Sequence, residues 1–248
     1  SGRVNTITGY SYSFFHFQEE PLSEIIEKAL GIRTFIENDS RAMAFGEFCS
    51  GVVSNEKNVL FVNLDYGIGL GILIDGKVYY GKSGFSGEFG HIPFFNNEII
   101  CHCGKKGCLE TEASGNALLR KFKEKIKQGY TSAALKKNKK IEDITLTDIV
   151  LAGQNEDVLT IELLAEIGEN LGKGLAVLIN VFNPELIILG GTLSETGEYL
   201  KLPTKSSINK YSLSLVNADT ELKLSKLGEK AGIIGACLLA KNKALSII

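Results

Sequence analysis

The chain has 248 residues, of which 44% are hydrophobic and 23% are charged, and its mean hydropathy of +0.07 is ordinary for a globular protein with a full core. The formal net charge of −2 and the sequence pI near 6.0 exclude a broad basic face for nucleic acid within this chain. No apolar run reaches the length of a membrane span.

The chain opens with SGRVNTITGYSYSFFHF (1–17), whose aromatic content and turn residues are typical of short strands. It lacks an initiator Met, so we expect this sequence to be the interior of a longer protein. His16 stands in the aromatic run and is predicted to be a packed or surface residue and not a metal ligand. Because no targeting segment is visible, we expect a cytoplasmic location and no membrane partner.

The next stretch alternates helix and strand signals. PLSEIIEKALG (21–31) has Pro at its start, apolar residues on one face and Gly at its end, which predicts a short helix. IRTFIE (32–37) is predicted to be a buried strand, and SRAMAFGEFCSG (40–51) a helix. Asn38 and Asp39 stand at the junction of that strand and helix, where α/β folds expose ligand-binding groups. Asp39 is also a favoured N-cap, and composition alone favours capping.

NVLFVNLDYGIGLGILIDGKVYYG (58–81) predicts three consecutive strands, the last two joined by a hairpin turn at Asp75-Gly76. Its continuous apolar runs imply a sheet covered on both faces. Gly67 and Gly69, in the loop after the first strand, have a spacing that lets backbone N–H groups approach a phosphate. A tight hairpin alone is the other explanation of the same glycines.

The stretch from Ser86 to Gly115, SGEFGHIPFFNNEIICHCGKKGCLETEASG, holds three of the five cysteines and two of the three histidines. Its candidate metal ligands are one imidazole and three thiols: His91, Cys101, Cys103 and Cys108. Three thiolates and one imidazole within reach of one point are a tetrahedral zinc set. Two glycines between the last two cysteines fit this prediction, because a chain that folds its own sulfurs around one ion needs tight turns.

Two alternatives stay open at this level. A disulfide could join two of these cysteines, although the odd total of five cysteines suits a reducing compartment better. His102 is a competing imidazole. It stands between two cysteines whose side chains turn toward the metal, so we expect its own side chain to point away as a surface residue.

GEFGH (87–91) followed by CHCGKKGCLE (101–110) resembles the zinc-binding signature of the ROK family, which comprises sugar kinases and sugar-responsive transcriptional repressors. The match is specific, because ligand spacing and flanking acids recur together, and the similarity runs over essentially the whole chain. It implies an α/β, actin-like ATPase (ribonuclease H-like) fold with a structural Zn²⁺. The later part of the N-terminal lobe would be residues 1–50, and the C-terminal lobe residues 51–248, with an inserted zinc loop, 86–115.

The resemblance also implies a sugar site. In that family the histidine of Gly-Glu-x-Gly-His binds zinc and touches the sugar, and the glutamates after its first glycine and its last cysteine hold sugar hydroxyls. ENDSRAMAFGE (37–47) resembles the kinases' segment whose aspartate is the general base, beside an asparagine that orients the sugar. The residues at the matching positions are Asn38, Asp39, Glu88, His91 and Glu110. Asp39 would be catalytic only in a kinase, because repressors of the family keep these residues for sensing.

Downstream of the zinc loop, helices are predicted at residues 113–129, 145–157, 158–184 and 230–245, and a strand at ELKLSKLG, residues 221–228. Glycines inside the long third helix predict that another element packs closely on that face. ELIILGG is a buried strand that ends in Gly190 and Gly191. A similar diglycine borders the adenosine site in the ROK family, so these two glycines are nucleotide candidates, with a tight strand exit as the alternative.

The loop Asp65-Tyr66-Gly67 departs from the kinases of the family. Those kinases usually have Gly-Thr-Gly there, with a threonine that contacts phosphate, whereas Asp followed by a ring-bearing residue resembles the repressors. We therefore predict the sugar-sensing and oligomerisation region of a ROK-family regulator, a homodimer or homotetramer whose DNA-binding segment lies outside this chain. The alternative is a kinase of a hexose or amino sugar that uses ATP and Mg²⁺, with Asp39 as its base.

Overall fold

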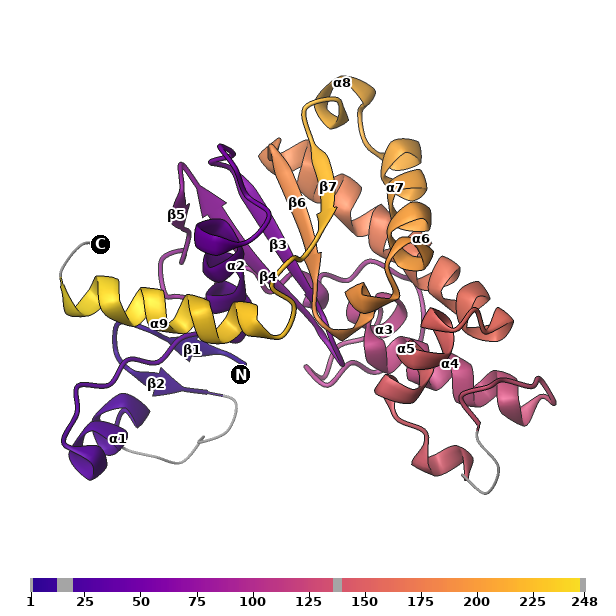
Figure 1. Ribbon diagram of the computed structural model, residues 1–248, viewed down its shortest axis with the longest axis horizontal. Helices are drawn as coiled ribbons and strands as arrows, with labels where there is room; N and C mark the ends of the chain where they lie inside the picture. Colours follow the sequence, from indigo (N-terminus) through magenta and orange to yellow (C-terminus); the bar gives the residue numbers. More distant parts are fainter. Residues whose placement is uncertain (1, 13–19, 136–139, 246–248) are drawn as a thin grey trace.

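The structure, a computed structural model, describes residues 2–12, 20–135 and 140–245 (Figure 1). His16 lies outside these ranges. The strands are β1 Val4–Asn5, β2 Tyr10–Ser11, β3 Val59–Leu64, β4 Ile68–Ile74, β5 Lys77–Val78, β6 Leu186–Gly190 and β7 Glu221–Leu224. The α-helices are α1 Leu22–Leu30, α2 Asp39–Ser50, α3 Glu110–Ala113, α4 Gly115–Lys127, α5 Leu146–Gln154, α6 Val158–Phe182, α7 Glu198–Tyr211, α8 Ser214–Asn217 and α9 Lys230–Ala244. Short 3₁₀ helices span Phe89–His91, Ile141–Asp143 and Thr192–Thr196.

A five-stranded mixed sheet forms the centre of the molecule, in the order β5-β4-β3-β6-β7. β3 pairs antiparallel with β4 and parallel with β6, and β6 pairs parallel with β7. The carboxyl ends of β3 and β6 therefore meet at one edge of the sheet, as Asn63 lies opposite Gly190. Ligand-binding groups gather at such edges in α/β folds.

Alternate residues of the central strands point to opposite faces of the sheet and fill two hydrophobic cores. Leu60, Val62 and Leu64 of β3 enter the larger core, beneath α4, α5, α6 and α7. Val59 and Phe61 enter the smaller core, beneath α2 and α9 (Figure 1). The sheet is covered on both faces, which confirms the prediction from its continuous apolar runs.

The predicted hairpin between β4 and β5 is confirmed. Asp75 and Gly76 both have positive φ, 51° and 75°. Two successive positive φ values define the type I′ turn, whose twist matches that of the flanking strands.

The packing predicted for the long helix is also confirmed, because α7 lies directly against its glycines. A Cβ atom at Gly172 would come within 2.5 Å of Ser207 Cβ, and one at Gly168 within 2.9 Å of the Leu200 carbonyl oxygen. No helix in the described ranges combines the length and apolar character that a membrane crossing needs.

The strand predicted at residues 32–37 is wrong. This segment has no regular secondary structure, pairs with no strand among the described residues, and is half-buried or exposed. Phe35 and Ile36 instead line a small cavity beside α9. A strand is defined by backbone pairing, and an apolar run of six residues does not show whether a pairing partner is within reach.

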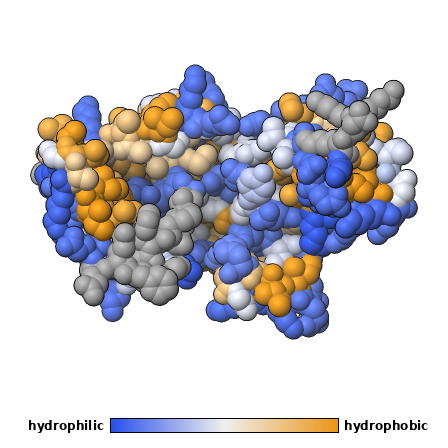
Figure 2. All heavy atoms as spheres, turned by 90° about the horizontal axis from the view of Figure 1, so that it is seen from below, coloured by the Kyte–Doolittle hydropathy of each residue, from blue (hydrophilic) through white to orange (hydrophobic). Residues whose placement is uncertain are grey.

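The predicted helix at residues 21–31 is confirmed as α1, and Gly31 ends it with a left-handed φ of 66°. Yet α1 buries none of its residues, and Leu30 and Ile32 are 64% and 67% exposed. Figure 2 shows hydrophobic residues gathered at the end of the molecule that carries α1 in Figure 1.

Candidate functional site

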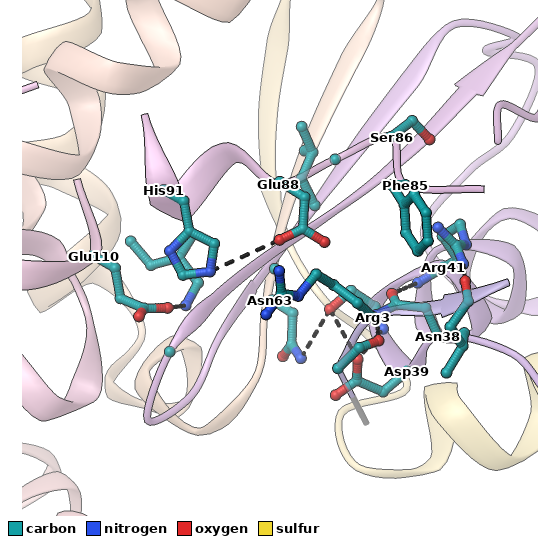
Figure 3. Close-up of a pocket in the computed structure, with 18 of the residues that line it drawn as sticks. Arg3, Asn38, Asp39, Arg41, Asn63, Phe85, Ser86, Glu88, His91 and Glu110 are labelled. Carbon is teal, nitrogen blue, oxygen red and sulfur yellow. Dashed lines mark hydrogen bonds and ion pairs between the residues drawn. The ribbon is translucent and has the colours of Figure 1, made fainter. Parts of the chain in front are cut away.

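A cavity of about 610 Å³ lies where β3 ends, β4 begins and α2 starts (Figure 3). Its volume is within the range of small-molecule sites. Polar side chains from segments far apart in the sequence line it together, and they include all five of the predicted sugar contacts: Asn38, Asp39, Glu88, His91 and Glu110.

The start of α2 presents Asp39 to this cavity. Asn38 is the N-cap, because its Oδ1 accepts from Arg41 N at 3.1 Å, while its Nδ2 donates to the Gly2 carbonyl at 3.1 Å. The alternative that Asp39 caps the helix is therefore wrong. Asp39 is the first helical residue and uses Oδ1 to accept from Ser40 N at 2.8 Å. A carboxylate at a helix N-terminus is stabilised by the helix dipole.

A buried ion pair fixes one wall of the cavity, a feature that the sequence analysis missed. Arg41 is 3% exposed, and its Nε donates to Glu37 Oε1 at 2.8 Å. Arg41 Nη1 also donates to the carbonyl of Gly84 at 2.8 Å, next to Phe85 of the cavity lining. Glu37 accepts in addition from Tyr80 Oη at 3.0 Å. These bonds connect the segment that holds Tyr80 and Gly84 to the start of α2.

The four predicted metal ligands lie together. One ligand atom from each of His91, Cys101, Cys103 and Cys108 can be chosen so that all lie within 4.8 Å of one another. Cys101 Sγ is 3.5 Å from His91 Nδ1, and Cys103 Sγ is 3.6 Å from Cys108 Sγ. Zn–S bonds of about 2.3 Å and Zn–N bonds of about 2.0 to 2.1 Å place tetrahedral neighbours roughly 3.5 to 3.8 Å apart. The donor set therefore fits zinc.

All five cysteines are free thiols, so the disulfide alternative is not realised. Burial raises the pKa of the Cys101 thiol to about 12 and also raises the pKa of Cys108. The pKa of Cys103 is lowered, because burial, which opposes ionisation, is outweighed by the backbone N–H of Lys105 and by the neighbouring thiols. A metal ion bound here has to displace thiol protons, so metal affinity falls as the pH falls.

Two glutamates stand beside this cluster. Glu110, the first residue of α3, is 7% exposed, and its Oε2 accepts from Ile68 N at 2.9 Å. Glu88 Oε2 lies 3.7 Å from His91 Nε2 (Figure 3). Nδ1 of His91 thus faces the thiols while Nε2 faces a cavity carboxylate. One imidazole can bind a metal and orient a ligand at the same time.

The four glycines predicted as nucleotide contacts are all explained by packing. A Cβ at Gly67 would lie 2.6 Å from Glu110 Oε2, and one at Gly69 would lie 2.0 Å from Ser40 Oγ. A Cβ at Gly190 would lie 2.3 Å from the Phe61 ring, and Gly191 has a φ of 80° at the exit of β6. A nucleotide role for Gly67, Gly69, Gly190 and Gly191 stays a prediction of the kinase alternative.

The sequence analysis did not predict the part that two further residues have in the cavity. Asn63, at the end of β3, is 8% exposed, and among the described residues its Oδ1 is a buried side-chain oxygen that lacks a hydrogen-bond partner. His102 is exposed, as expected, but the prediction that it points away from the site is wrong: its Nδ1 lies 2.8 Å from Glu110 Oε1. Neither the unpartnered Oδ1 of Asn63 nor the contact of His102 with Glu110 can be predicted from a single sequence.

Comparison with solved structures defines the class of this molecule. The structure of a ROK family transcriptional regulator, a homolog of the E. coli MLC protein, has a TM-score of 0.84 and 32% identity, and the match covers 97% of this chain and 60% of that chain. A ROK family glucokinase from Streptomyces griseus, in complex with glucose and AMPPNP, has a TM-score of 0.83 and 31% identity over 91% of this chain and 73% of that one. The fold is the α/β actin-like ATPase fold, as predicted.

The chain belongs to the ROK family, whose sequence profile matches residues 5–243. The glucokinase of Halalkalibacterium halodurans is 31% identical over 249 residues, which cover 99% of this chain and 76% of the kinase. The xylose repressor of Caldicellulosiruptor bescii is 31% identical over 230 residues, 93% of this chain but only 57% of the repressor. Kinases and repressors are equally similar to this chain.

Proposed function

We propose that this chain is the sugar-sensing and oligomerisation region of a ROK-family transcriptional regulator. One observation carries the proposal: the residues predicted to hold a sugar, which come from α2, the zinc loop and α3, line one cavity. Carboxylates, an amide and an imidazole are the groups that hydrogen-bond hydroxyls of a small polar ligand. A sugar that binds one arrangement of the surrounding elements better than another would shift the population of the two.

In this proposal His91, Cys101, Cys103 and Cys108 hold a structural Zn²⁺. The ion would crosslink the loop between β5 and α3, so that its binding and the folding of the loop are one process. His91 and the start of α3 would then be held in register, and with them Glu88 and Glu110. The Glu110 carboxylate packs closely against the backbone at Gly67 and Gly90, since a Cβ atom at these positions would lie 2.6 and 3.4 Å from its Oε2.

The charge at the ends of β3 and β6 favours sensing over phosphoryl transfer. Asp65 Oδ1 lies 3.2 Å from Thr192 Oγ1, next to the diglycine at the end of β6. Tyr66, at the same turn, is 49% exposed and lines the cavity. A fixed carboxylate at the place predicted for nucleotide phosphates repels a polyphosphate, and a phenol does not replace a threonine hydroxyl that binds one.

The second candidate function is an ATP-dependent sugar kinase. It is favoured by Asp39, whose carboxylate lines the cavity at the start of α2, as a general base for a sugar hydroxyl requires. In that case Asp39 would take the hydroxyl proton as the oxygen attacks the γ-phosphate of ATP, and Mg²⁺ would neutralise the developing charge.

Two experiments on the full-length protein distinguish the two functions. The regulator predicts specific DNA binding that changes by about tenfold or more when glucose, xylose or N-acetylglucosamine is added, measured by fluorescence anisotropy on operator fragments. The kinase predicts sugar-dependent ATP turnover that Asp39→Asn abolishes and the remote, exposed substitution Glu221→Gln leaves unchanged. Turnover of this kind without sugar-dependent DNA binding would contradict the regulator.

A further inference from the structure

His102 stands out because it is solvent-exposed and yet makes a specific contact with a buried carboxylate. Its side chain is 70% exposed, whereas that of Glu110 is 8% exposed, and the atoms Nδ1 and Oε1 lie 2.8 Å apart. His102 also lines the cavity, and its ring lies 4.9 Å from the His91 ring at an interplanar angle of 74°. His102 therefore links the solvent-exposed surface of its loop to a buried carboxylate that lines the cavity.

Glu110 is held at both oxygens. Oε2 accepts from Ile68 N, and Oε1 faces His102 Nδ1 and, at 3.5 Å, Cys101 Sγ. The Cys101 thiol would lose its proton on binding zinc and could then no longer donate to Oε1. A carboxylate oxygen accepts hydrogen bonds, so we assign the hydrogen of this contact to Nδ1 of His102. The last torsion of a glutamate is broad, so a single hydrogen bond does not fix its plane, whereas a bond at each oxygen does. The remaining lone pairs of both oxygens then point in set directions.

His102 acts on Glu110 and is not part of the zinc set. Its Nδ1 is 3.9 Å from Cys101 Sγ, farther than the 3.5 Å that separates His91 Nδ1 from the same sulfur. His91, His102 and Glu110 form a second compact group of possible ligands, which shares His91 with the zinc set and contains none of the thiols. Among the described residues, the shortest polar contact of the His102 ring is the one with Glu110.

We propose that His102 is a positioning residue for sugar recognition: it orients the Glu110 carboxylate toward the cavity and forms part of the cavity rim. This inference rests on the proposed sugar site, since Glu110 is there the residue that holds a sugar hydroxyl. Loss of the Nδ1–H donor removes one hydrogen bond to a charged group, and we expect a loss of sugar affinity of about tenfold.

The test compares His102→Asn, whose amide N–H₂ replaces Nδ1–H, with His102→Leu, which has no donor. Calorimetric titrations use zinc-loaded protein and glucose, xylose and N-acetylglucosamine in turn, and zinc content is measured on each variant. We expect His102→Leu to weaken the sugar that wild type binds by about tenfold, His102→Asn to restore most of that affinity, and all three proteins to hold the same amount of zinc.

An ¹⁵N NMR spectrum of the imidazoles provides a readout that does not depend on sugar. We expect the Nδ1–H tautomer for His102 in wild type and its loss in Glu110→Ala. If His102→Leu binds the sugar with wild-type affinity, or if His102 is the Nε2–H tautomer in wild type, this inference fails and the proposed function still stands. Loss of zinc in His102→Leu overturns it as well, because His102 is then a metal ligand. If wild type binds none of the sugars, the proposed function fails, and this inference fails with it.

Discussion

Replacement of Asn63 by Val should stabilise the fold and weaken ligand binding. Among the described residues, Oδ1 of Asn63 has no hydrogen-bond partner, and Nδ2 makes one long bond of 3.4 Å to Ser40 Oγ. An unsatisfied buried polar group costs about 1 to 3 kcal/mol, whereas a neutral hydrogen bond contributes about 0.5 to 1.5 kcal/mol. A β-branched residue also suits the end of β3.

The expected net gain for Asn63→Val is about 1 kcal/mol, which raises Tm by about 2 to 4 °C in a chain of this size. Thermal unfolding followed by circular dichroism measures it, and Ser40→Ala in both backgrounds isolates the bond to Ser40. Sugar affinity should fall, since a polar residue kept at a cost to stability is typical of a binding site. A lower Tm for Asn63→Val would refute the reasoning, because it would show that Oδ1 has a partner in solution.

Three further predictions concern stability and metal. Cys103→Ser should abolish the binding of one zinc per chain, measured by elemental analysis, and zinc retained in the variant would contradict the proposed ligand set. The zinc affinity of wild type should fall as the pH is lowered. Arg41→Met should cost about 3 kcal/mol in urea unfolding, because Glu37 loses its closest cationic partner and keeps only Tyr80, Asn38 N and the more distant Lys243. Glu37→Gln added to it should recover much of that loss, and additive losses would contradict this. Asp157→Ala should cost about 1 to 2 kcal/mol, because Asp157 caps α6.

The Asp157 prediction has a defined pH dependence. Burial acts to raise the pKa of Asp157, but donors from Ala133, Thr160 and Ser132 outweigh it, so the pKa is lowered from 3.8. The carboxylate therefore stabilises the fold fully above about pH 4, and the contribution is lost as the pH falls through the lowered pKa. The difference in unfolding free energy between wild type and Asp157→Asn should shrink in that acid range, and a difference that is constant with pH would contradict this cause.

Local chemistry carried the predictions of single elements, whereas the fold class came from the resemblance to the ROK family. The turn at Asp75-Gly76 could be predicted because its two positive φ values depend on its own residues. The glycines of α6 indicated that another element packs closely there, although they did not identify that element as α7. Residues 32–37 failed because a strand needs a partner, and pairing is not a local property.

The same distinction separates the parts of the site. Spacing alone assembled the thiols of Cys101, Cys103 and Cys108, because they are close in the sequence. Asn38 caps α2 in place of Asp39, and the hydrogen bond that decides this, from Arg41 N to Asn38, cannot be chosen from the sequence alone. Contacts between distant segments, such as that of Arg41 with Gly84, could be found only in three dimensions.

The most direct test of the account is a calorimetric titration of zinc-loaded protein with glucose, xylose and N-acetylglucosamine, repeated on Glu110→Gln. The account predicts saturable binding of at least one sugar by wild type at one site per chain, and a loss of about tenfold or more in Glu110→Gln at unchanged zinc content. No binding heat from any sugar, or equal affinity in the two proteins, would contradict the claim that this cavity is a sugar site.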